Sequence, residues 1–211
     1  MVEQFPLKEE VDGSNPSRLT RMIDYKSLFS VLAVVLTLVA YIPYLRSILK
    51  GQTKPHMYSW LVWFVDSLII FILQLTNNAG PGAYVTLAAA VMCFIVLILS
   101  FSKGTKDIKK VDGIFLVTAF IALGLWWFAK QPLLSAILIT GVDLFGFAPT
   151  VRKAWRAPNS ETATFYFINS IRFVLAILAL SQYSIINMIY PATWLVANGL
   201  FGISLVLRRK S

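Results

Sequence analysis

The chain has 211 residues, of which 57% are hydrophobic and 14% are charged, and its formal net charge is +9. Soluble domains carry about 25% charged residues, so the composition argues against a water-soluble globular protein. A basic excess can indicate a nucleic-acid partner, but here the lysines and arginines form short clusters between long apolar runs. The composition therefore predicts a protein whose surface mostly faces lipid.

Seven apolar runs follow one another along the chain, and each is about long enough to cross a bilayer as an α-helix. They cover residues 28–49, 57–76, 82–102, 112–129, 133–151, 162–181 and 185–207. Long runs without alternating polarity predict helices rather than the strands of a membrane barrel. We therefore expect an all-α membrane protein with seven transmembrane helices.

The basic residues are distributed unevenly between successive loops. Thirteen of them fall on one side of the predicted helices, within residues 46–54, 103–110, 152–156 and 208–210. The loops on the other side carry only Lys130. Because loops rich in Lys and Arg remain in the cytoplasm, the chain is predicted to be multi-pass in the cell membrane, with its N-terminus outside and its C-terminus cytoplasmic.

The chain shows a weak internal repeat when it is shifted by 106 residues, which places segment 41–46 on segment 147–152. The first three predicted helices then match the last three without a gap, and the fourth is left over. We expect two parallel three-helix repeats joined by a linker helix (3+1+3), related by an axis along the membrane normal. The expected parts are a polar, disordered tail at 1–27, a first repeat at 28–103, a linker loop and helix at 104–131, and a second repeat with a short basic tail at 132–211.

Each repeat has a proline near the cytoplasmic end of its first helix, Pro43 in one and Pro149 in the other. Proline removes a backbone hydrogen bond and kinks a helix. Two prolines at equivalent positions predict a pair of hinges, whereas the simpler interpretation is a feature of the helix ends without a mechanical role.

In this layout the chain resembles the PQ-loop proteins and the SWEET (MtN3-type) sugar transporters over nearly everything after residue 27. The resemblance is carried by the 3+1+3 layout, the outside N-terminus, the Pro-x-x-Arg segments that begin at Pro43 and Pro149, and Asn198 in the last helix. Tyr44 and Thr150 stand where the family motif has glutamine. The resemblance implies a carrier that moves a sugar or similar metabolite by alternating access between two three-helix halves.

Three ionisable side chains fall near the middle of the predicted membrane spans, namely Asp66, Asp143 and Arg172. Such groups are costly near the bilayer centre, so they usually face the interior of a bundle or a cavity. Helical spacing places Trp63 on the face of Asp66, and Asn169 on the face of Arg172.

We expect these residues and Asn198 to line a polar binding site for the solute. The complete predicted set is Trp63, Asp66, Asp143, Asn169, Arg172 and Asn198. A second interpretation remains open, in which Arg172 and an aspartate form a buried ion pair that only fixes helix packing.

The sequence contains no HExxH, Walker or GxSxG motif and no Cys/His cluster, so we expect neither an enzyme nor a cofactor or metal site. The expected partners are a small polar solute and the lipid bilayer, without nucleic acid, and a homo-oligomer is left open. Alternatives to a carrier are a ligand-sensing or cargo-binding membrane protein on the same scaffold, and an accessory membrane subunit without transport.

We expect single cysteines at Asn78 and Gln131 to react with an impermeant reagent added outside, and cysteines at Lys106 and Asn159 to remain unlabelled. The reason is the alternation of basic and uncharged loops. Labelling of positions 106 and 131 from the same side would rule out seven crossings.

Overall fold

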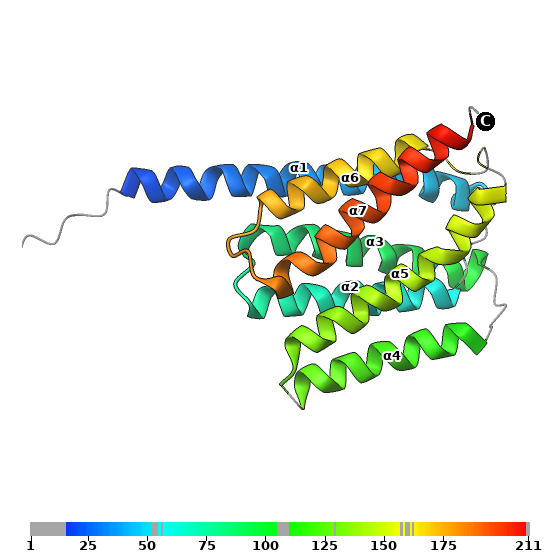
Figure 1. Ribbon diagram of the computed structural model, residues 1–211, viewed down its shortest axis with the longest axis horizontal. Coiled ribbons are helices and arrows are strands. Elements are labelled where there is room, and N and C mark those ends of the chain that lie inside the picture. The colour runs from blue at the N-terminus through cyan, green and yellow to red at the C-terminus, as the bar shows by residue number, and fades with distance from the viewer. Residues whose placement is uncertain are drawn as a thin grey trace, which may run out of the picture.

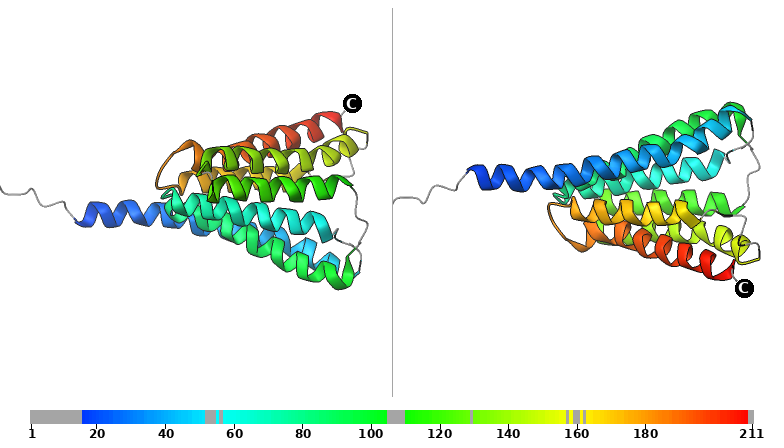
Figure 2. Two further views of the ribbon diagram at one scale, coloured as in Figure 1. Left: turned by 90° about the horizontal axis from the view of Figure 1, so that it is seen from below. Right: turned by 90° about the horizontal axis from the view of Figure 1, so that it is seen from above.

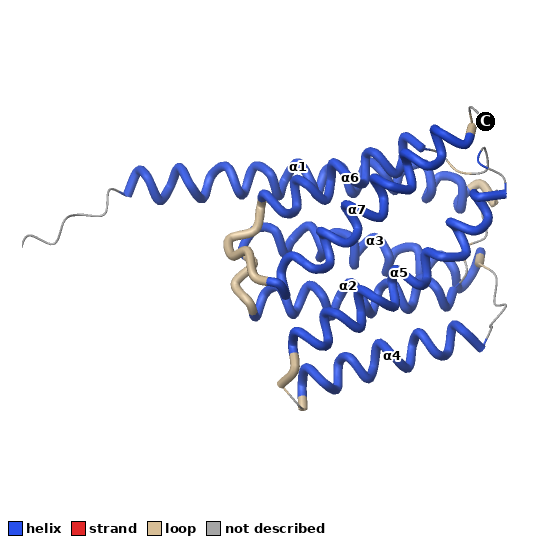
Figure 3. The backbone as a smooth tube through the Cα atoms, viewed as in Figure 1, coloured by secondary structure: helices blue, strands red, loops and turns tan. Residues whose placement is uncertain are grey.

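The computed structural model describes residues 16–51, 57–104, 110–128, 130–156 and 163–209, together with Pro55, Pro158 and Glu161. The regular elements of this part are α1 (Pro16–Leu49), α2 (Met57–Thr76), the 3-10 helix η1 (Gly80–Gly82), α3 (Ala83–Lys103), α4 (Lys110–Trp127), α5 (Pro132–Arg156), α6 (Ala163–Leu178) and α7 (Ile185–Arg208). The described residues form no β-strand (Figure 3). The prediction of an all-α protein is confirmed.

The start of α1 corrects the expected boundary of the N-terminal tail. The helix begins at Pro16, so residues 16–27, which the composition assigns to a disordered tail, are helical. Proline is well suited to the first position of a helix, because its φ is already set and its missing N–H is not needed there. Extending a helix that already exists adds one hydrogen bond per residue without a new nucleation cost.

Four of the helices are long and apolar enough to cross a membrane. They are Tyr25–Leu49, Ser59–Thr76, Gly80–Lys103 and Ile185–Arg208, while the apolar stretches Pro132–Phe147 and Ala163–Leu178 are shorter. Large apolar side chains lie exposed on the outside of the bundle, as Val31, Val35 and Val39 do on α1. A soluble protein rarely exposes a surface of this kind, whereas lipid covers it without cost.

Consecutive helices run in opposite directions along the bundle (Figure 1). The helices α1, α3, α5 and α7 all end at one end of the bundle, which we call the basic end. It carries Arg46, Lys50, Lys103, Arg208 and Arg209. The turns between α2 and α3 and between α6 and α7 lie at the opposite end.

We call α1–α3 the first group of helices and α5–α7 the second group. In the first group α3 lies between α1 and α2, and in the second α7 lies between α5 and α6. Between the groups, α1 packs on α6 and α2 packs on α5, while α4 packs on α5 and α2. The ribbons of the two groups diverge towards the basic end (Figure 2).

Candidate functional site

Asp66 of α2 and Asp143 of α5 lie opposite each other in the contact between the two groups. Nearer the basic end, the indole nitrogen of Trp63 lies next to Gly146. The helices α2 and α5 are antiparallel, so the residue three positions after Trp63 faces the residue three positions before Gly146. The same register therefore pairs Asp66 with Asp143. The two carboxyl groups lie close enough to interact electrostatically, and their side chains are 0% and 4% exposed.

Arg172 of α6 and Thr37 of α1 make the corresponding contact in the other pair of helices. The guanidinium Nη1 donates a hydrogen bond to Thr37 Oγ1 at 3.3 Å, and the guanidinium carbon lies 4.1 Å from the ring centre of Phe173. The 106-residue shift places Thr37 on Asp143 and Asp66 on Arg172. The same helix–helix contact therefore holds two carboxyl groups in one place, and a guanidinium with a hydroxyl in the other.

Arg172 does not form the buried ion pair that one interpretation of the sequence predicts. Its described hydrogen bond goes to Thr37, and among the described residues no ion pair joins it to Asp66 or Asp143. The buried Nε of Arg172, both carboxylate oxygens of Asp66 and one of Asp143 have no hydrogen-bond partner. The interpretation fails because the register of α2 and α5 turns the two acids towards each other.

Further polar groups without partners lie near Asp143. Tyr190 and Trp194 of α7 lie beside its carboxyl group, and the indole N–H of Trp194 makes no hydrogen bond. The hydroxyl of Thr140, one turn before Asp143 on α5, is buried and unpaired as well. Buried polar groups in proteins are nearly always hydrogen bonded, so this concentration of exceptions marks a candidate site.

The other three residues described from the predicted site, Trp63, Asn169 and Asn198, make contacts within their own helices. Trp63 packs edge-on against Trp60 with ring centres 5.0 Å apart. Asn169 donates to the backbone of its own helix at 2.9 Å, and Asn198 donates to the carbonyl of Trp194 at 2.7 Å. Asp66 and Asp143 are thus brought together, whereas a single cavity lined by all six residues stays a prediction.

The two predicted hinge prolines lie in corresponding helices. Pro43 lies inside α1, and position 149 falls within α5, where the side chain lies outside the described residues. Their mechanical role stays a prediction.

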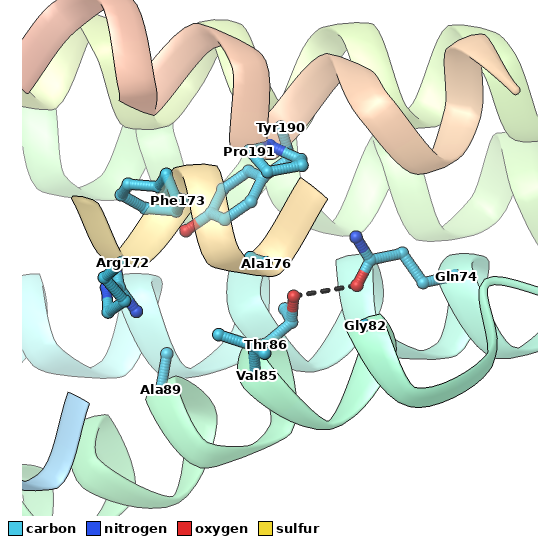
Figure 4. Close-up of a pocket in the computed structure, with 10 residues that line it drawn as sticks. All are labelled: Gln74, Gly82, Val85, Thr86, Ala89, Arg172, Phe173, Ala176, Tyr190 and Pro191. Atoms are coloured by element: carbon cyan, nitrogen blue, oxygen red, sulfur yellow. Dashed lines mark hydrogen bonds between the residues drawn. The ribbon is translucent and has the colours of Figure 1, made fainter. Parts of the chain in front are cut away.

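A polar network that the sequence analysis missed joins α2, α3 and α7. Pro191 lies inside α7 and has no N–H, so the carbonyl of Asn187 one turn earlier loses its helical donor. Gln74 of α2 donates to that carbonyl at 3.2 Å, and Thr86 of α3 donates to the Gln74 side chain at 2.7 Å (Figure 4). A proline in the middle of an apolar run is the sequence signal that could have revealed this network.

A small pocket lies between this network and Arg172 (Figure 4). Its walls come from α2, η1, α3, α6 and α7, and it therefore lies between the two helix groups. Its polar lining is formed by Gln74, Thr86, Arg172 and Tyr190. Arg172 is the one residue of the predicted site that lines it.

The two groups are hydrogen bonded to each other at the opposite end of the bundle. Backbone bonds run from Ser181 N to Ala79 O at 2.7 Å and from Gly82 N to Ala179 O at 3.0 Å. Gly80 has a φ of +66°, and a Cβ there would collide with Ser181. Glycine therefore permits both the backbone conformation and the close approach of the two turns.

At the basic end, two of the described hydrogen bonds each join residues of a single group. Lys103 donates to the carbonyl of Leu49 at 2.9 Å inside the first group, and Arg208 donates to the carbonyl of Trp155 at 2.9 Å inside the second.

Comparisons with protein-family models, with curated proteins and with solved structures find no match for this chain.

We expect Gln74→Leu to lower the free energy of unfolding by about 1–3 kcal/mol, because the Asn187 carbonyl and the Thr86 hydroxyl would lose their partner in a buried position. Thermal denaturation of the purified protein in lipid nanodiscs measures the change. Gln131→Leu, at an exposed glutamine, is the matched control and should melt like the wild type. Equal melting temperatures for all three proteins would contradict the role of this network.

Proposed function

We propose that this protein is a membrane carrier that moves a small polar solute by alternating access between the groups α1–α3 and α5–α7. The observation that carries the proposal is the difference between the two ends of the bundle. At the opposite end, backbone hydrogen bonds join the groups, and towards the basic end their ribbons diverge (Figure 2). In a carrier one end is closed while the solute enters at the other, and the bonded turns support closure of the opposite end.

The proposal includes seven membrane crossings in a 3+1+3 layout, and the helix contacts support it. A shift by 106 residues turns the contact of α1 with α3 into that of α5 with α7, and the contact of α1 with α6 into that of α5 with α2. The pairs Thr37–Arg172 and Asp143–Asp66 repeat this relation at single positions. Parallel repeats related by an axis along the membrane normal account for both observations.

The same features support the likeness to the PQ-loop and SWEET transporters, which we retain as part of the proposal. α4 contributes one crossing that lets α5 run in the same direction as α1 (Figure 1). The orientation proposed from the basic residues places the basic end in the cytoplasm. The structure would then represent the state that is closed to the outside.

The buried polar groups between the helix groups support a polar solute. Asp66, Asp143 and Arg172 lie in the middle portions of their helices with unpaired atoms. Such atoms are costly when the protein is empty. A solute with hydrogen-bonding groups relieves this cost while it is bound, and rocking of the groups would then release it on the other side.

We expect a disulfide between cysteines at positions 79 and 181, in a Cys93→Ala background, to abolish transport. The 2.7 Å backbone bond between Ser181 and Ala79 holds the two turns about as close as a disulfide requires. The crosslink would keep the opposite end closed. Uptake of labelled glucose, glycine and propionate into liposomes, measured before and after reduction of the disulfide, tests this expectation.

Each single-cysteine variant under the same oxidant is a matched control and should transport like the Cys93→Ala parent. Full transport through a protein whose disulfide is verified by mass spectrometry would contradict alternating access. Binding of a probe to the parent without any flux would favour the ligand-sensing alternative instead.

A further inference from the structure

We infer that the side chains of Gln74 and Asn187 form a reciprocal clasp that holds the two helix groups closed at the opposite end, and that Pro191 supplies the acceptor on which the clasp depends. The clasp consists of these two amide side chains and the two backbone carbonyls that they bond. The inference rests on the proposed alternation between two states, because it names what holds one of them closed.

Each helix group sends one amide side chain to the backbone of the other group. Gln74 of α2 donates to the carbonyl of Asn187 in α7 at 3.2 Å. In return, the Asn187 side chain donates at 2.9 Å to the carbonyl of Asn77, the residue that follows α2. The Gln74 and Asn187 side chains are 1% and 0% exposed. Both bonds therefore cross the contact between the groups in the interior of the bundle.

The two acceptors of the clasp are carbonyls that their own helices leave without a donor. Each lies four residues before a proline, which is the spacing at which a helical N–H would otherwise bond it. Pro191 follows Asn187 inside α7, and Pro81 follows Asn77 beyond the end of α2. Because proline has no N–H, both carbonyls depend on a partner from elsewhere.

This dependence makes the clasp both strong and releasable. While the end is closed, parting the groups would leave two bare carbonyls in an apolar surrounding, which is costly. Once the end is open to water, water molecules bond the same carbonyls and amides, so the exchange costs much less. The clasp therefore ties opening of this end to its hydration. A carbonyl with its own helical donor would not hold the groups in this way.

Thr86 of α3 positions the Gln74 amide for the clasp. Its hydroxyl donates to the Gln74 side-chain oxygen at 2.7 Å, which leaves the amide nitrogen free to donate to Asn187 (Figure 4). Thr86 and Gln74 both belong to the first group, so their bond does not have to break when the groups part. The amide thus stays oriented and can close again on the same carbonyl.

The test measures the distance between spin labels on Thr76→Cys and Gln182→Cys in a Cys93→Ala background. Both positions are exposed, and they lie at the opposite end in different helix groups (Figure 1). Double electron–electron resonance of the protein in lipid nanodiscs then resolves a short distance for the closed end and a longer one for the open end. The labelled parent should show mostly the short distance.

Pro191→Ala should raise the ratio of open to closed protein about 5-fold, which is the worth of one net hydrogen bond. The restored backbone N–H bonds the Asn187 carbonyl in both states, so Gln74 no longer favours the closed one. Gln74→Leu should raise the ratio by a similar factor in the parent. Added to Pro191→Ala, it should change the ratio by less than about 2-fold, because the acceptor no longer needs Gln74.

Gln131→Leu is the matched control, because it makes the same substitution at an exposed glutamine, and its distances should equal those of the parent. An unchanged ratio in Pro191→Ala would overturn the inference, and a helix readily accepts this substitution. The test therefore does not depend on whether Gln74→Leu folds. An equal effect of Gln74→Leu with and without Pro191→Ala would also overturn the inference.

Uptake of labelled glucose, glycine and propionate by the same variants separates the clasp from the function on which it rests. Uptake together with the expected shifts in distance supports both. Uptake by proteins whose distances no variant alters overturns the clasp and leaves the carrier standing. The expected shifts without uptake of any probe support the clasp and contradict the carrier. Neither shifts nor uptake would overturn both.

Discussion

Inside a bilayer a polar group has no water to bond, so its partner must come from the protein or from a ligand. Most polar side chains in these helices meet this demand by bonding their own backbone, as Thr37 does with Ala33 and Asn198 with Trp194. The carbonyl released by Pro191 is satisfied by a side chain from another helix. Against this background the unpaired buried atoms of Asp66 and Arg172 stand apart.

The helices themselves could be read from the sequence, because lipid enforces long apolar segments with internal hydrogen bonds. The run at 57–76 coincides with α2. The start of α1 could not be found in this way, since hydropathy reports the length that lipid covers and helical structure can continue beyond it. The contact of Asp66 with Asp143 was missed for another reason. Opposite charges were expected to meet, but the register of packed helices decides which side chains face each other.

The proposed repeat, with unlike residues at matched positions, would explain how one protein can hold both acidic and basic side chains between its helix groups. The first group contributes Asp66 and Thr37, and the second contributes Arg172 and Asp143 at the positions that correspond to them. The backbone contact is kept while its chemistry differs. On this proposal the repeat would supply two similar frames, and the residues that differ between them would set the chemistry of the contact.

The length of α1 has a mechanical consequence. At about 1.5 Å per residue its 34 residues span about 51 Å, whereas the hydrocarbon core of a bilayer is about 30 Å thick. The helix therefore projects well beyond the other helices at the opposite end (Figure 1). A continuous helix transmits tilt along its whole length, so a small rotation of the first group would swing the tip of α1 through a larger arc. In the proposed carrier, the projecting segment would thus act as a lever that carries movement between the helix groups beyond the end of the bundle.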